Sequence, residues 1–150
     1  MKRGEVVSIA ISPKKGMKKH CVQSAFLVAD RGIENDAHAE GGLRQVSLLM
    51  EESIVKMKES GVSVSYGDFA ENIVTRGVDL KSLKIDDRIY IGSETELIVT
   101  MIGKTCAAPC RIYYDVGYCI MPEEGVFARV IRGGTVRAGD NIKVLGDDSD

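Results

Sequence analysis

Short runs of apolar and β-branched residues recur along the chain, and turns rich in glycine, proline and acidic residues separate them. Runs of this length between turn residues predict β-strands. A further run, residues 62–66, alternates as a strand or an extended linker, so the pattern predicts about seven or eight short strands. The other predicted strands cover residues 5–12, 22–28, 44–50, 67–75, 89–91, 96–102 and 142–144.

One segment has helical character instead. Between residues 51 and 60, Ile54 and Met57 fall on one helical face, and Gly61 stands where a helix end favours glycine. Many short strands with short connections and one or two short helices predict a closed antiparallel β-barrel, because closure removes exposed sheet edges. Loops at one mouth of such a barrel are the expected place for a functional site.

Two distant segments, residues 83–92 and 136–145, share a similar pattern. In each, an acidic turn residue, Asp87 or Asp140, comes just before a strand. The repetition predicts two equivalent turn-and-strand units at the rim of the barrel.

Composition narrows the class of protein. With 150 residues, 44% of them hydrophobic, the chain is the size of one globular domain, which we assign to residues 1–145. The net charge of -2 supports no nucleic-acid footprint, and no apolar run reaches the length of a membrane span. We therefore expect a cytoplasmic protein with neither nucleic-acid nor membrane partners. Residues 146–150 form an acidic tail that we expect to be disordered.

Three of the four cysteines lie within residues 103–122, at Cys106, Cys110 and Cys119. In a reducing compartment such cysteines are more often free thiols, metal ligands or redox groups than disulfides. Lys104 and Arg111 flank the first two, and a nearby cation favours the thiolate, which attacks electrophiles and binds soft metals. This cysteine segment is the predicted thiolate site, whereas Cys21, far from it in sequence, is predicted to be a small core or loop thiol.

A polar loop holds Asp36, His38 and Glu40 at alternate positions. If the loop is extended, the three side chains point the same way and could bind a metal or act as acid and base. The alternative is a turn in which such side chains bond to their own backbone.

Five ordered blocks resemble the MOSC domain, named after the C-terminal domain of molybdenum-cofactor sulfurases, and the likeness as a whole runs from about residue 4 to 145. Together they are far more specific than any one block. They are the GI-x-x-D-x-H loop from Gly32 to His38, RQVSLL from Arg44 to Leu49, GDFAENI from Gly67 to Ile73, GK-x-C with PC from Gly103 to Cys110, and G-x-CIMP-x-EGVFARV from Gly117 to Val130.

The resemblance implies a β-barrel that binds the molybdenum cofactor or carries sulfur to it. In the family, the cysteine of the PC pair is expected to bear sulfane sulfur or to meet the metal, which maps onto Cys110; the short stand-alone branch adds Cys106 and Cys119. That branch often has histidine where this chain has Ala107, which removes one ligand or base. The pyridoxal-phosphate-dependent half of full sulfurases is missing from this sequence, so we expect sulfur transfer at most, not a complete sulfurase, with a cysteine desulfurase as sulfur donor.

The pterin tail of the cofactor ends in phosphate, and cationic side chains suit it. A second set of polar side chains could hydrogen-bond the pterin edge or orient the cysteine segment. The predicted anion-binding residues are Arg44, Lys104, Arg111 and Arg129, and the second set is Asp36, His38, Glu71 and Asn72.

Two other classes of function stay open on the sequence. In one, the three clustered cysteines with Cys21 or His38 bind a structural zinc, although the short C-x2-C knuckles of many zinc sites are missing. In the other, the domain is a non-catalytic module that docks cofactor-handling proteins.

Overall fold

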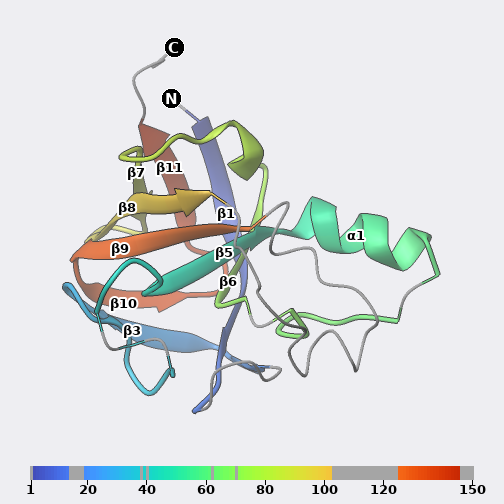
Figure 1. Cartoon of the computed structure of the whole chain (residues 1–150), viewed down its shortest axis with the longest axis horizontal. Coiled ribbons are helices and arrows are strands. Elements are labelled where there is room, and N and C mark those ends of the chain that lie inside the picture. Colours follow the sequence, from blue (N-terminus) through green and yellow to red (C-terminus); the bar gives the residue numbers. More distant parts are fainter. Residues whose placement is uncertain are drawn as a thin grey trace.

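The structure is a computed structural model, and it describes residues 2–13, 19–37, 39, 41–61, 63–69, 71–102 and 125–145. Strands dominate these residues, and one α-helix projects from them (Figure 1). The elements are β1 Lys2–Ile11, β2 His20–Val22, β3 Ser24–Val28, β4 Gly32–Ile33, β5 Val46–Met50, α1 Glu51–Glu59, β6 Ile73–Arg76, the 3-10 helix η1 Leu80–Ser82, β7 Arg88–Ile91, β8 Thr95–Ile102, β9 Val126–Arg132, β10 Gly134–Arg137 and β11 Asn141–Leu145.

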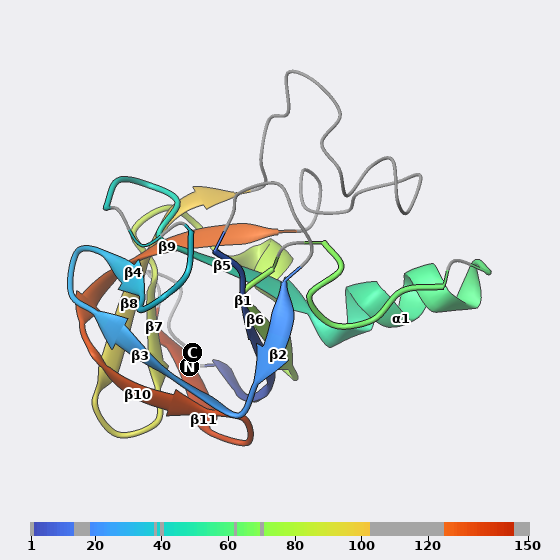
Figure 2. The same ribbon diagram turned by 90° about the horizontal axis from the view of Figure 1, so that it is seen from below.

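The main sheet closes on itself. Its strand order is β11-β7-β8-β9-β5-β6-β1-β2, and β1 pairs with β11 as well as with β6, which closes a barrel of seven strands. The ring of strands is seen in Figure 2. A smaller sheet, β10-β3-β4, lies beside it. The predicted barrel with one or two short helices is confirmed.

One strand pair differs from the antiparallel pattern. β5 and β6 run parallel, with Leu48 opposite Ile73, while the other pairs of the described sheets are antiparallel. A parallel neighbour needs a crossover connection, and α1 lies in the connection between these two strands. Residues 63–66, predicted as a strand or linker, form no strand. The predicted strand at 22–28 is divided at Gln23 into β2 and β3.

The two similar acidic turns are equivalent in the structure. The Asp87 carboxylate accepts the backbone N–H of Lys84 at 2.9 Å, and the Asp140 carboxylate accepts that of Arg137 at 2.8 Å. The strands that follow, β7 and β11, are antiparallel neighbours, with Ile89 opposite Val144. An Asp side chain that bonds three residues back is a common way to fix such a turn.

Apolar side chains form two clusters. The larger one, with Val6, Ile9 and Leu48 among its members, gathers the inward-facing residues of the barrel strands. The smaller one, which we call the second core, lies between the outer face of the sheet and α1. The second core comprises Leu49, Ile54, Val64, Phe69, Val74 and Phe127, with Val7, Met57, Tyr66 and Met101 packed against it. Ile54 and Met57 thus share one helix face, as predicted.

Replacing Thr75 by Val should stabilise the fold by about 1 kcal/mol, since a buried hydroxyl without a hydrogen bond costs free energy. Thr75 is fully buried on β6, and its Oγ1 atom has no hydrogen-bond partner among the described residues. Urea unfolding of both proteins measures the change. Thr100→Val is the matched control, because the Thr100 hydroxyl bonds the carbonyl oxygens of Leu43 and Phe127. A lower midpoint for Thr75→Val would mean that its hydroxyl is satisfied in solution.

Candidate functional site

The cysteine segment begins and ends at two paired strands. Ile102, the last residue of β8, lies opposite Val126, the first residue of β9, and Met101 lies opposite Phe127. We call these four residues the root of the cysteine segment. The predicted site residues of this segment all lie outside the described part of the chain: Lys104, Cys106, Cys110, Arg111 and Cys119.

The root is held by packing on one side of the sheet. Phe127 belongs to the second core and Met101 packs against it. The aromatic side chain of Phe127 is only 2% exposed. Because a well-packed interior resists displacement, both ends of the cysteine segment start from a rigid base.

Two of the predicted arginines lie near this root. The guanidinium carbon of Arg44 is 5.8 Å from the centre of the Phe127 ring, a cation–π distance. Arg129 lies two residues after Phe127 on β9, so the two side chains leave the same face of the strand. Arg129 Nη1 is 3.6 Å from Asp30 Oδ1, and the Arg129 side chain is 41% exposed. Both guanidinium groups are therefore reachable from solvent.

Gln45 connects these arginines, and sequence reasoning missed it. Its Nε2 atom donates to Asp30 Oδ1 at 3.2 Å, and its Oε1 atom accepts the backbone N–H of Val130 at 2.9 Å. Gln45 is fully buried. The sequence feature that could have pointed to Gln45 is its position next to Arg44 in the RQVSLL block. It fixes the backbone beside Arg44 to β9 and holds the Asp30 carboxylate near Arg129.

Glu71 faces inward. Its carboxylate accepts the backbone N–H groups of Gly67 at 2.5 Å and Phe69 at 3.0 Å, and the residue is fully buried. Burial raises the pKa of Glu71 to about 7, although the two N–H donors favour the charged form. These contacts hold the turn that carries Phe69 into the second core.

Asn72 joins three strands. Its Oδ1 atom accepts the backbone N–H of Ser47 at 2.9 Å and the Ser47 hydroxyl at 3.1 Å, and its Nδ2 atom donates to the carbonyl of Ala10 at 3.1 Å. Asn72 is 1% exposed. The side chain therefore fixes the start of β6 between β5 and β1.

Asp36 lies in a buried ion pair. Its Oδ1 atom is 2.8 Å from Lys19 Nζ and accepts the backbone N–H of Ser12 at 3.0 Å. Both charged side chains are almost fully buried. The contacts tie the polar loop to the end of β1. Of the other two residues in the alternating set, His38 lies outside the described residues, as does Glu40.

Cys21 is the exposed thiol of β2. Its Sγ atom donates to the carbonyl of Tyr66 at 3.7 Å and lies 4.0 Å from the Ser8 hydroxyl. The sequence predicted a small core or loop thiol, but Cys21 is exposed, because β2 is an edge strand of the sheet.

Across residues 2–102 and 125–145, as far as they are described, no group of three or more His, Cys, Asp or Glu side chains could hold a metal ion. No helix in that part is long and apolar enough to cross a membrane.

The fold and this site define a small β-barrel domain in which two arginines lie near the root, the paired strand ends that the cysteine segment joins in sequence. A model of the MOSC domain matches residues 35–143, more than two thirds of the chain, and the chain belongs to this family. MOSC domains are associated with the molybdenum cofactor, so this is a molybdenum-cofactor-related domain. No match to a curated protein was found.

The solved structures that share this fold include the following three. YuaD from Bacillus subtilis superposes with a TM-score of 0.77 at 21% identity, covering 95% of this chain and 95% of that one. YiiM from Geobacillus stearothermophilus gives 0.73 at 16% identity, covering 95% and 75%. YiiM from Escherichia coli gives 0.67 at 18% identity, covering 97% and 72%.

Proposed function

We propose that this domain binds the molybdenum cofactor and carries sulfane sulfur on Cys110 for delivery to molybdenum or another metal-sulfur acceptor. The observation that carries the proposal is the position of the root, which lies at the paired ends of β8 and β9 with Arg44 beside Phe127. Membership in the MOSC family supports the link to the cofactor. Lys104 and Arg111 adjoin the cysteines in sequence and favour the thiolate form.

The proposed loading step needs no outside oxidant. The Cys110 thiolate attacks the terminal sulfur of a persulfide on a donor protein, such as a cysteine desulfurase. A sulfur–sulfur bond forms to Cys110 as the donor bond breaks, and the donor cysteine leaves as its thiolate. Cys106 and Cys119 are the further thiols of the same segment, able to accept the sulfur in turn.

The described residues fit the anionic end of the cofactor better than its metal. Arg44 and Arg129 present exposed guanidinium groups, which suit a phosphate. Asp36, Glu71 and Asn72 are buried and bonded internally, so in this proposal they position loops. Cys110 is the proposed metal ligand, because thiolates are soft ligands. The bound cofactor would supply an electrophilic molybdenum centre to receive sulfur.

We also propose a cytoplasmic location and a partner that handles the cofactor. Cys21 is exposed and free. Exposed free thiols persist in a reducing compartment, whereas an oxidising one tends to pair them.

Sulfur loading is tested by incubating the purified chain with a cysteine desulfurase and cysteine, then measuring intact mass. We expect a gain of one sulfur atom in the wild type and in Cys21→Ala, and none in Cys110→Ala. Cys21→Ala is the matched control because it removes an exposed thiol outside the segment. Cys106→Ser with Cys110→Ser should melt near the wild-type temperature, because the apolar side chains of β1, β5, β8 and β11 supply a core of their own. Loading that survives Cys110→Ala would contradict the assignment, and a large fall in melting temperature on chelation with zinc release would favour the zinc scaffold.

Arg44→Ala should weaken cofactor binding by about 1.5–3 kcal/mol, the range for a hydrogen bond to a charged group. The net charge of the chain is slightly negative, so an anionic cofactor depends on local positive side chains for electrostatic attraction. Affinity for the pterin cofactor is measured by titration, with Arg129→Ala in parallel. Arg3→Ala is the control, since it removes the same charge from an exposed position near the start of β1. Equal affinities in all four proteins would exclude both arginines from the site.

A further inference from the structure

The outer face of the smaller sheet carries an exposed aromatic side chain. Leu27, Ile33 and Val136 turn inward and belong to the larger apolar cluster, so the residues next to them along the chain face solvent. Phe26 is one of these outward-facing residues, and it is 48% exposed. Figure 1 shows its strand, β3, beside β10 at the bottom of the view. An aromatic ring therefore stands on a face where polar side chains are usual.

Phe26 has a polar neighbour on each side across the sheet. Thr135 is its cross-strand partner on β10. On the other side, the backbone N–H of Glu34 donates to the Phe26 carbonyl at 2.9 Å, next to the pair of Leu27 and Ile33. Side chains directly opposite each other on one face of a sheet have Cβ atoms about 4.5–5.5 Å apart. The Phe26 ring and the Glu34 carboxylate can therefore contact the same small ligand.

A hollow of about 250 Å³ opens at this position, beside Phe26 and the end of β1 at Ile11. Glu34 is the only charged residue among the described residues that line it. Several polar side chains of this lining have no hydrogen bond or ion pair with any residue that the structure describes, namely Ser24, Glu34, Asn35 and Thr135. The hollow thus presents a carboxylate that no cation of the described lining compensates.

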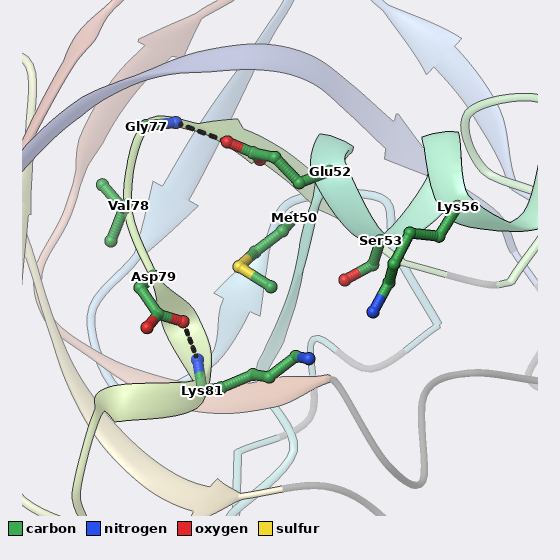
Figure 3. Close-up of a pocket in the computed structure, with 8 residues that line it drawn as sticks. All are labelled: Met50, Glu52, Ser53, Lys56, Gly77, Val78, Asp79 and Lys81. Atoms are coloured by element: carbon green, nitrogen blue, oxygen red, sulfur yellow. Dashed lines mark hydrogen bonds between the residues drawn. The ribbon is translucent and has the colours of Figure 1, made fainter.

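The larger hollow between α1 and η1, of about 490 Å³, has no such excess of charge (Figure 3). Its described lining holds two lysines, Lys56 and Lys81, and two carboxylates, Glu52 and Asp79. Glu52 accepts the backbone N–H of Gly77 at 3.1 Å, and Asp79 accepts that of Lys81 at 3.1 Å. Because these charges balance, the smaller hollow is the better candidate for a ligand that is selected by its charge.

Arg137 is the cation of β10 that shares the outer face with Phe26. It pairs with Ser24, two positions along from the pair of Thr135 and Phe26, and it is not among the described residues that line the hollow. Glu34 lies on the opposite side of β3 from β10. The Arg137 charge should therefore weaken the attraction of a cation to the hollow without occupying it.

We propose that this hollow binds the ammonium group of a small organic amine. An ammonium group has N–H donors and no acceptor, and the Glu34 carboxylate, the Thr135 hydroxyl and the Asn35 amide oxygen are acceptors. The face of an aromatic ring also attracts a cation, which gives the exposed Phe26 ring a role. The apolar groups of Ile11 and Phe26 suit the carbon chain of the amine.

The test is an NMR titration of the full chain with butylammonium, 1-butanol and butyrate, which share a short alkyl chain and differ in charge. Backbone amide shifts report both the place and the affinity of binding. We expect butylammonium to shift the amides of Phe26, Glu34 and Thr135. It should bind about fivefold more tightly than 1-butanol, because the neutral alcohol lacks the charge that the carboxylate and the ring attract. Butyrate should bind most weakly.

Four variants separate the contributions to binding. Glu34→Gln should raise the dissociation constant for butylammonium about fivefold, and Phe26→Leu about threefold, since leucine is apolar but has no ring face. Arg137→Gln should lower the constant by up to about twofold, because it removes a like charge. Glu59→Gln is the matched control, since it removes a carboxylate from an exposed position at the end of α1, and it should leave the constant unchanged.

Amide shifts that match those of the wild type away from the hollow will show that each variant is folded. The proposal is overturned if butylammonium causes no shifts or shifts elsewhere, if 1-butanol or butyrate binds as tightly, or if Glu59→Gln weakens binding as much as Glu34→Gln does. Cys110→Ala and Arg44→Ala should keep amine binding, so a failure of the sulfur or cofactor proposal and a failure of this one are seen separately.

Discussion

Asp36→Ala is expected to lower the free energy of unfolding by about 3–5 kcal/mol, the usual cost of removing one partner of a buried ion pair. Lys19 and Asp36 are both almost fully buried, and their charged atoms are 2.8 Å apart. Without the carboxylate, the Lys19 ammonium group stays buried without its counter-ion, and the backbone N–H of Ser12 loses its acceptor. Urea unfolding at neutral pH measures the loss.

Two further variants make this prediction specific. Adding Lys19→Met to Asp36→Ala should recover part of the lost stability, because the uncompensated charge is then gone. Glu34→Ala, which removes an exposed carboxylate from the same loop, should change stability by less than about 0.5 kcal/mol. If Asp36→Ala costs no more than Glu34→Ala, the pair does not hold this loop in solution.

The protein should lose stability as the pH rises from about 4.5 to about 7 through the titration of Glu71. Burial raises the pKa of Glu71 in the folded state to about 7, from an ordinary value of 4.5. The folded state then holds the proton more tightly than the unfolded state does. The stabilisation is fully present below the unfolded pKa and is lost as the pH passes the folded pKa, a difference of about 3 kcal/mol.

Glu71→Gln provides the measurement, since it cannot titrate. Urea unfolding of both proteins at several pH values between 4 and 8 gives the difference in stability between them, and other titrating groups cancel in that difference. Glutamine replaces one acceptor oxygen by an N–H₂ group, so the variant carries a constant loss at all pH values. The wild type should therefore lose its relative advantage as the pH rises. A difference that is independent of pH would show that Glu71 keeps its ordinary pKa.

Local signals in the sequence accounted for much of the barrel. The β-branched runs predicted β1, β5 and β8, and the helix signals predicted α1. The acidic turns at Asp87 and Asp140 form the same bond to the residue three positions earlier. These features depend on residues within a few positions of one another, which is the range over which periodicity and turn chemistry act.

The candidate site was predictable only in part. The arginines near the root were named from the family blocks, but the sequence did not indicate that Gln45 connects them through Asp30. Glu71 was expected to hydrogen-bond the pterin edge or to orient the cysteine segment, and in the structure its carboxylate accepts backbone N–H groups of its own turn. The side-chain types suggested chemistry, but burial decides whether a carboxylate faces a ligand or the protein.

The sequence alone indicated the helix, the segment in which the thiols gather and most of the strands, but it did not predict β4, β9 or β10. The tertiary structure decided the partners: β1 with β11, β5 parallel to β6, Lys19 with Asp36 and Ser47 with Asn72. Each of these contacts joins residues far apart in the chain, and local periodicity carries no information about which distant segment will pair.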